Sequence, residues 1–269
     1  MPLDWMDVSD LSFNTLLLLE QVQLSWMPGW LPERELAVAL RANPAVEWYM
    51  RHKCPALNEW LDRVMAAPPA EGAGDPAETR RAEVTVLSAM TDLVVYAVDP
   101  AVYDAQPFLG WDTDELLSLV DFTGKTVIDV GAGTGRLTLA AAAKAHTVFA
   151  VEPVANLRAY LKQKARARGW RNVYPVDGLI TDIPFPEEMA DVTMSGHVFG
   201  DEPEAEYREL RRVTRPGGLI ILCSGNSDLD NNTHRFLVSQ GFAWSRFEEP
   251  RDGWKRKYWL AVVSHGDAE

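Results

Sequence analysis

Residues 126–136 read Thr-Val-Ile-Asp-Val-Gly-Ala-Gly-Thr-Gly-Arg and form the most informative stretch of the chain. An apolar run ends here at three glycines spaced two apart, Gly131, Gly133 and Gly135, and an alanine-rich segment follows at once. This order predicts a strand, a tight turn and the start of a helix. Glycine allows positive φ and close approach of the backbone to a ligand, and a helix start favours a negative group. We therefore expect a nucleotide-type binding loop here.

The spacing of the glycines and a nearby acid indicate which cofactor the loop binds. The dinucleotide fingerprint requires a small residue at the position of Arg136, and the chain contains no Walker sequence. A second apolar strand, predicted at 147–151, ends in Glu152. A carboxylate at that strand tip suits a ribose, because it can accept both hydroxyl protons. A nicotinamide oxidoreductase is therefore the less favoured hypothesis.

Over roughly residues 112–263 the chain resembles the class I S-adenosylmethionine-dependent methyltransferases, because several motifs occur in the order typical of that family. The turn Arg215-Pro216-Gly217-Gly218 before a buried strand is typical of members that methylate small metabolites. The resemblance implies S-adenosyl-L-methionine as cofactor, S-adenosyl-L-homocysteine as product and a small-molecule methyl acceptor. The matching strings are Val127–Gly135, Val148–Pro153, Val176–Pro186, Ala190–Val192 and Leu210–Leu222.

The resemblance also implies roles for the loops that follow the strands. Asp129 would orient the glycine loop or meet the amino group of the cofactor. The family often has an acid directly after the third-motif glycine, Gly178, but Leu179 stands there. The backbone around Leu179 and Ile180 would therefore flank adenine, with Asp182 a weaker candidate. The implied cofactor-binding residues are Asp129, Gly131, Ala132, Gly133, Gly135, Glu152, Pro153, Gly178, Leu179, Ile180 and Ser195.

The loop after the predicted fourth strand carries the candidate for catalysis. Two glycines bracket His197, and in similar enzymes this loop lies near the transferred methyl group. His197 is a candidate general base, although it could also only pack or hydrogen-bond near the cofactor. Phe199 would lie near the methyl group as well. Tyr103 and Trp111 are candidates for an aromatic wall of the acceptor pocket, with ordinary packing as the favoured alternative for either one.

The pattern of elements predicts the architecture. Alternating strands and helices from residue 126 onward indicate an α/β fold with a doubly wound, mostly parallel, seven-stranded Rossmann-like sheet. Its last two strands, near 242–248 and 256–263, would form an antiparallel addition. Residues 112–269 are then the cofactor-binding methyltransferase domain.

Residues 1–111 are expected to form an N-terminal helical cap that selects the substrate. A linker-like loop rich in Pro and Gly is predicted at 66–78, followed by one helix over about 78–98. The segment before residue 66 is rich in tryptophan. Such a cap over the sheet suggests an enclosed, partly aromatic acceptor pocket.

Composition and charge restrict the partners. The net charge is −13, and residues 1–120 hold 7 Lys and Arg against 19 Asp and Glu, so nucleic acid is disfavoured as a substrate. The basic cluster Arg158–Arg171 is interpreted as a solvated helix face. No apolar run approaches the ~20 residues of a membrane span, and the start lacks the positive region of a secretion signal. We expect a cytoplasmic protein without a membrane partner. Two cysteines and no metal-ligand spacing argue against a metal site.

A function without turnover stays open. Leu179 and the absence of a clear catalytic string permit a catalytically inactive S-adenosylmethionine-binding module with a regulatory or interaction role. O-, N-, S- and C-methylation share this scaffold, so the acceptor atom is not identified by the sequence. The oligomeric state is also left open.

Overall fold

The computed structural model describes residues 6–68, 74–106, 109–110, 112–223, 228–249 and 253–263, and the chain divides into two compact units. The first unit is Met1–Asp104 and the second is Ala105–Glu269. The division lies earlier than the predicted boundary between residues 111 and 112. It follows helix α7 (Pro100–Asp104), which packs on the preceding helix through an edge-to-face contact of Tyr103 with Tyr96.

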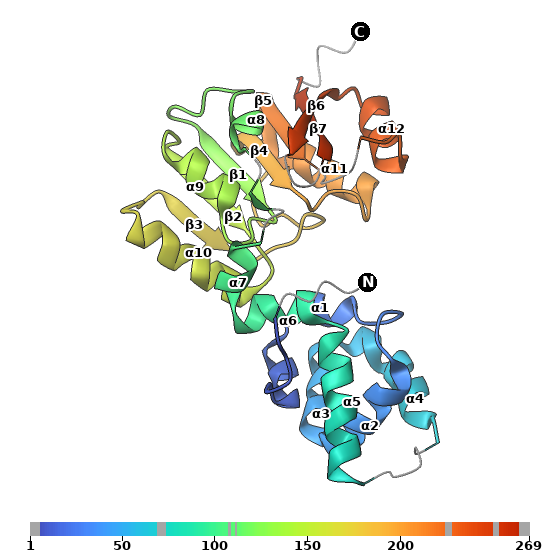
Figure 1. The fold of residues 1–269 in the computed structure, drawn as a ribbon. Coiled ribbons are helices and arrows are strands. Elements are labelled where there is room, and N and C mark those ends of the chain that lie inside the picture. The colour runs from blue at the N-terminus through green and yellow to red at the C-terminus, as the bar shows by residue number, and fades with distance from the viewer. Residues whose placement is uncertain are drawn as a thin grey trace. The chain divides into compact units, whose positions relative to one another are not determined.

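The first unit consists of short helices around an apolar core of its own (Figure 1). Pro44, Pro55 and Pro76 each stand at the start of a helix, where the missing N–H has no intrahelical partner to lose. Buried Gln23 donates a 2.9 Å hydrogen bond to the carbonyl oxygen of Leu93 and so joins two distant helices. The helices before α7 are η1 (Phe13–Leu18), α1 (Gln21–Ser25), α2 (Glu33–Ala42), α3 (Pro44–Lys53), η2 (Pro55–Leu57), α4 (Asn58–Ala66), α5 (Pro76–Ser88) and α6 (Thr91–Val98).

The single helix predicted over 78–98 is wrong, because the structure has two helices, α5 and α6, in its place. Helix α5 begins at Pro76, where Asp75 caps the first turn through a 3.0 Å hydrogen bond to a backbone N–H. The loop predicted at 66–78 therefore ends before Pro76. Between the two helices the buried Met90 takes a non-helical backbone conformation (φ −132°, ψ 29°).

The second unit contains a seven-stranded sheet in the order β3-β2-β1-β4-β5-β7-β6 (Figure 1). Strands β1 to β5 are parallel, and β7 is antiparallel to both of its neighbours, β5 and β6. This topology confirms the predicted doubly wound, mostly parallel α/β fold. The strands are β1 (Thr126–Val130), β2 (Thr147–Val151), β3 (Val173–Val176), β4 (Ala190–Gly196), β5 (Thr214–Cys223), β6 (Ala243–Glu249) and β7 (Gly253–Ala261).

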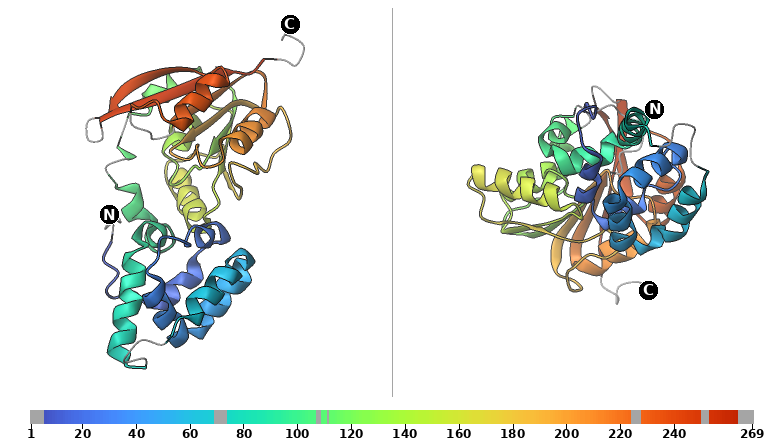
Figure 2. Two further views of the ribbon diagram at one scale, coloured as in Figure 1. Left: turned by 90° about the vertical axis from the view of Figure 1, so that its right-hand side faces the viewer. Right: turned by 90° about the horizontal axis from the view of Figure 1, so that it is seen from below.

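Helices cover both faces of this sheet (Figure 2). On one face Leu139 and Leu161 pack against the strands, and on the other face Leu210 and Leu237 do so. The first pair belongs to α9 and α10, and the second pair to α11 and α12. The helices are α8 (Asp114–Leu117), α9 (Arg136–Ala142), α10 (Ala155–Ala167), α11 (Pro203–Val213) and α12 (Asn232–Ser239).

The register of the parallel strands brings three loops to one edge of the sheet. Val130, the last residue of β1, pairs with Val151 of β2 on one side and with Ser195 of β4 on the other. The segments that follow these strands therefore leave the sheet at the same edge. In open α/β sheets ligands bind at this carboxyl edge.

Gly135 allows helix α10 to lie close to the start of α9. Its φ is 85°, and a Cβ atom built there would lie 2.0 Å from Cδ1 of Leu161. Glycine is thus required at this position both by the backbone conformation and by packing.

Replacing Gly135 by alanine should destabilise the second unit by ~2–5 kcal/mol, because a left-handed residue costs ~1–2 kcal/mol and overpacking adds ~1–3 kcal/mol. Gly169→Ala is the matched control, since its φ is 75° and no atom lies within 4 Å of a Cβ built there. Urea unfolding of both variants measures the difference. Equal losses would show that Leu161 moves aside without cost.

Candidate functional site

The loop after β1 is closed by hydrogen bonds to the neighbouring strand and within itself. The N–H groups of Gly131 and Ala132 both donate to the carbonyl oxygen of Val151, at 2.8 and 3.1 Å. The N–H of Gly135 donates to the carbonyl oxygen of Ala132 at 2.8 Å. All three glycines of the motif have positive φ, 69° at Gly131, 52° at Gly133 and 85° at Gly135. The narrow turn expected from the sequence is present.

Gly131 also lets the loop after β4 lie against the glycine loop. A Cβ atom at Gly131 would lie 2.1 Å from Cγ2 of Val198. Val198 directly follows His197 in the chain, so this glycine sets how closely the histidine-bearing loop approaches the end of β1. From the sequence we predict that Gly131 lets a ligand approach the backbone closely. The structure adds a second reason for glycine here, because a side chain would collide with Val198.

Asp129 lies beneath the glycine loop and is only 1% exposed. Its Oδ2 accepts a 2.5 Å hydrogen bond from the hydroxyl of Thr138 on α9. Burial raises the pKa of Asp129 to about 7, against the lowering effect of the Thr138 hydrogen bonds. This hydrogen bond ties Asp129 to α9, the helix that follows the glycine loop.

Glu152 stands at the tip of β2 with both carboxylate oxygens held by backbone donors. Oε2 accepts from the N–H of Gly133 at 2.9 Å, and Oε1 accepts from the N–H of Val154 at 2.9 Å. Burial raises the pKa of Glu152, while these two hydrogen bonds and the charge of Arg158 oppose the rise. Half-buried Pro153 follows directly. The two hydrogen bonds thus fix the carboxylate beside the glycine loop.

The predicted adenine segment forms a closed turn after β3. The N–H of Leu179 donates to the carbonyl oxygen of Asp182 at 3.3 Å, and the reverse bond measures 3.1 Å. The Leu179 side chain is 39% exposed and Ile180 is half-buried. Gly178 has little room, because a Cβ there would lie 2.6 Å from Cδ of Pro184. The Leu179 amide is therefore used by the turn itself, and an apolar side chain is what this segment presents.

The end of β4 and the loop that follows it carry Ser195, His197 and Phe199. The Ser195 hydroxyl is buried and has no hydrogen-bond partner among the described residues. His197 has φ 65°, an uncommon value for a residue other than glycine, and its N–H donates to the carbonyl oxygen of Cys223 at 2.7 Å. Phe199 is buried in the apolar core and packs on Phe236. The loop thus contributes a strained histidine, and its phenylalanine belongs to the core.

Of the two aromatic candidates before the sheet, Tyr103 lies on α7 in the first unit, where it contacts Tyr96. This contact is the packing role that the sequence also allowed. Trp111 lies outside the described residues.

Two cations of helix α10 support the site and were not identified from the sequence. Arg158 Nη1 donates to the carbonyl oxygen of Glu152 at 2.6 Å and to Oδ1 of Asp177 at 2.8 Å. Lys164 Nζ donates to the carbonyl oxygen of Thr134 in the glycine loop at 3.0 Å. The basic cluster was interpreted as a solvated face, which is wrong for these two residues. No local signal distinguishes them, because a paired and a solvated cation look alike in a sequence.

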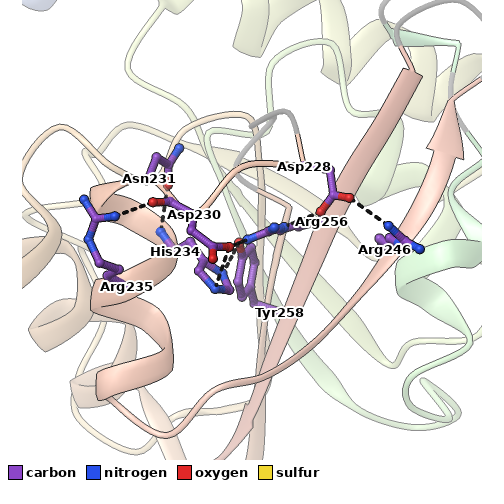
Figure 3. Close-up of polar contacts among 8 residues, drawn as sticks. All are labelled: Asp228, Asp230, Asn231, His234, Arg235, Arg246, Arg256 and Tyr258. Carbon is purple, nitrogen blue, oxygen red and sulfur yellow. Dashed lines mark hydrogen bonds and ion pairs between the residues drawn. The ribbon is translucent and has the colours of Figure 1, made fainter.

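A charged network borders the carboxyl end of β5. Figure 3 shows Arg256 of β7 between two carboxylates, with Nε 2.7 Å from Asp228 Oδ1 and Nη1 2.8 Å from Asp230 Oδ1. Nδ1 of His234 lies 3.2 Å from the hydroxyl oxygen of buried Tyr258, which pairs with Leu222 near the end of β5. The network fixes the start of α12 to β7. Its members are spread over some thirty positions of the chain and form no motif.

Within the described residues, no group of three or more His, Cys, Asp or Glu side chains is placed to hold a metal ion. In the same part of the chain, every helix is too short or too polar to cross a bilayer.

Replacing Asp129 by asparagine should change how stability depends on pH. Because the folded-state pKa of Asp129 is raised, its ionisation opposes folding as the pH rises from about 4 to 7. Asp129→Asn removes that effect. The free energy of unfolding of the variant, relative to that of the wild type, should therefore rise from pH 5 to pH 8, by on the order of a few kcal/mol. Thermal unfolding at the two pH values measures the gain. A difference that does not vary with pH would contradict the assignment.

Comparisons with known proteins agree with the fold of the second unit. The family described as methyltransferase domain matches residues 128–222. An uncharacterized methyltransferase of Geobacillus thermodenitrificans is 32% identical over 168 residues, which cover 60% of this chain and 74% of that protein. A demethylmenaquinone methyltransferase of Geobacillus stearothermophilus is 30% identical over 118 residues, and the chain spans 50% of its length.

A solved structure supports the same fold. A SAM-dependent methyltransferase from Aquifex aeolicus matches 61% of this chain and 99% of its own, with 19% identity and a TM-score of 0.50. The seven-stranded, mostly parallel sheet of the second unit agrees with this fold. The chain therefore belongs to the class I S-adenosylmethionine-dependent methyltransferase family.

Proposed function

We propose that this protein transfers a methyl group from S-adenosylmethionine to a small-molecule acceptor. The observation that carries the proposal is the carboxylate of Glu152, which two backbone N–H groups orient beside the glycine loop. A carboxylate oxygen accepts more than one hydrogen bond, so both oxygens can still accept from the vicinal hydroxyl groups of a ribose. Membership of the methyltransferase family supports the same assignment.

The residues at the sheet edge fit the parts of the cofactor. Glu152 and Pro153 would bind the ribose, and the segment Gly131–Gly135, oriented by Asp129, would hold the methionine part. The buried hydroxyl of Ser195 would gain a hydrogen-bond partner from the bound cofactor. Adenine would pack on Leu179 and Ile180 through apolar contact, because the Leu179 amide is already bonded to Asp182.

The protein contributes alignment and, where the acceptor needs it, a base. S-adenosylmethionine supplies a methyl group on a positively charged sulfur. An acceptor atom attacks this methyl carbon in line with the carbon–sulfur bond, and S-adenosylhomocysteine leaves. Exclusion of water and orientation of the acceptor provide much of the rate enhancement in such a displacement. His197 would take the proton from a hydroxyl or ammonium acceptor, since imidazole titrates in the physiological range.

For the acceptor we propose a small, partly aromatic molecule. The tryptophans and Tyr103 in the first hundred or so residues motivate this choice, and the acidic composition of that part of the chain opposes a nucleic-acid acceptor. One relative is named a demethylmenaquinone methyltransferase. Hydroxylated aromatic compounds and demethylmenaquinone are therefore the first acceptors to test.

A binding module without turnover is the second candidate, because Leu179 replaces the usual adenine-binding acid and its amide is occupied. Transfer of radiolabelled methyl groups to a panel of small acceptors separates the two functions. Transfer to any of them supports the enzyme. Tight cofactor binding with no transfer across the panel supports the module.

We expect the protein to bind S-adenosylmethionine and S-adenosylhomocysteine with micromolar affinity and not to bind NADH. Glu152→Gln should weaken S-adenosylhomocysteine binding by about tenfold or more, because the amide NH₂ would face a backbone N–H where an oxygen now accepts. Glu187→Gln, at an exposed position, is the control. Calorimetric titration measures the affinities for S-adenosylmethionine, S-adenosylhomocysteine and NADH. Absence of binding to both adenosyl ligands would contradict the proposal.

His197→Asn should lower methyl transfer to the identified acceptor by ~100-fold or more and leave S-adenosylhomocysteine binding unchanged. Asparagine is chosen because it tolerates the left-handed backbone of this position better than alanine does. The pH profile of the remaining activity should lose its acidic limb. Near-normal turnover of the variant would assign His197 to packing.

A further inference from the structure

The contacts of Arg158 link the ends of two neighbouring strands. Its guanidinium donates to the backbone carbonyl of Glu152 at the end of β2 and to the carboxylate of Asp177 after β3. The Asp177 side chain is 75% exposed, whereas the Arg158 side chain is only 21% exposed. An ion pair with so exposed a partner contributes little stability on its own. The hydrogen bond from Arg158 to the backbone carbonyl of Glu152 is therefore the contact on which we base its role.

The position of Arg158 in its helix is electrostatically unfavourable. It lies in the first turn of α10, where the helix dipole disfavours a cation, and that turn contains no acidic residue. A cation placed against the dipole needs compensation from elsewhere. Here the compensation comes from the Glu152 carbonyl and from the carboxylates of Glu152 and Asp177.

Burial raises the pKa of the Glu152 carboxylate, and the hydrogen bonds from the N–H groups of Val154 and Gly133 oppose that rise. Two charged side chains also act on this carboxylate: Arg158 favours its ionised form, whereas Asp177 disfavours it. Arg158 is thus a cation that adds to the two hydrogen bonds in opposing the effects of burial and of Asp177. An ionised carboxylate is the form that can accept from both hydroxyl groups of a ribose.

We propose that Arg158 is a positioning residue for ribose recognition, which holds the end of β2 and supplies the positive charge that keeps the Glu152 carboxylate able to bind a diol. This inference rests on the proposed use of S-adenosylmethionine. It assigns to a helix cation of this chain a part in cofactor binding without direct contact to the cofactor.

Calorimetric titration with S-adenosylhomocysteine at pH 6 and pH 8 tests the proposal in the full-length protein. Arg158→Leu should weaken binding by about tenfold at pH 6 and by much less at pH 8, because loss of the cation raises the pKa of Glu152. Arg158→Lys should restore most of the affinity. Asp177→Asn breaks the ion pair but removes a negative charge, so its affinity at pH 6 should equal or exceed that of the wild type.

Two results of the titration would overturn the proposal. One is an Arg158→Leu variant with wild-type affinity at both pH values. The other is an Asp177→Asn variant that reproduces the losses of Arg158→Leu, which would make Arg158 a mechanical link between the strands.

Thermal unfolding without ligand tests the inference even if the wild type binds no S-adenosylhomocysteine. Such an absence of binding would contradict the proposed function but not the role of Arg158. A raised pKa of Glu152 means that stability falls as the pH rises through the window between its unfolded and folded values. The fall in Tm from pH 5 to pH 8 should be larger in Arg158→Leu than in the wild type and smaller in Asp177→Asn. Equal falls in all three proteins would overturn the role of Arg158.

Discussion

The hydrogen bonds of the buried Glu152 carboxylate are the interactions on which the arrangement of the loops at the carboxyl edge of the sheet depends. The carboxylate accepts N–H groups from the glycine loop and from the residue before α10, so one side chain joins β1, β2 and a helix. A buried charge is costly unless it is hydrogen-bonded or paired. The donors around Glu152 meet that condition, and they also fix the directions in which its remaining lone pairs point.

Strands, loops and topology could be predicted because their signals are local. Apolar runs followed by glycine or an acid locate β1 and β2, and helix α11 lies where its sequence pattern places it. The break between α5 and α6 was not predictable in this way. Helical residues continue through Met90, and the burial of that side chain in the core of the first unit goes with a non-helical backbone there.

The part of the site that the sequence did not reveal consists of contacts between distant residues. Arg158 meets Asp177, Gly131 faces Val198, and Arg256 joins two aspartates that precede α12. Each of these residues belongs to an ordinary class in the sequence, namely a helix cation, a loop glycine and a strand arginine. The partners come together only through the order of the strands in the sheet. The spacing of the residues along the chain therefore does not predict these contacts.

In the proposed cofactor site, Leu179 would change which parts of the cofactor are recognised by hydrogen bonds. Where an acid usually accepts a hydrogen bond from adenine, this chain offers an apolar side chain on a turn whose amide bonds to Asp182. Apolar contact with a flat base depends little on which groups the base carries. If the protein binds S-adenosylmethionine as proposed, selectivity would fall on the ribose and the methionine end, and therefore on Glu152 and the groups that keep it charged. With Leu179 in place of an acid, cofactor binding in the proposed site would depend more strongly on Arg158, whose guanidinium donates to the backbone carbonyl of Glu152.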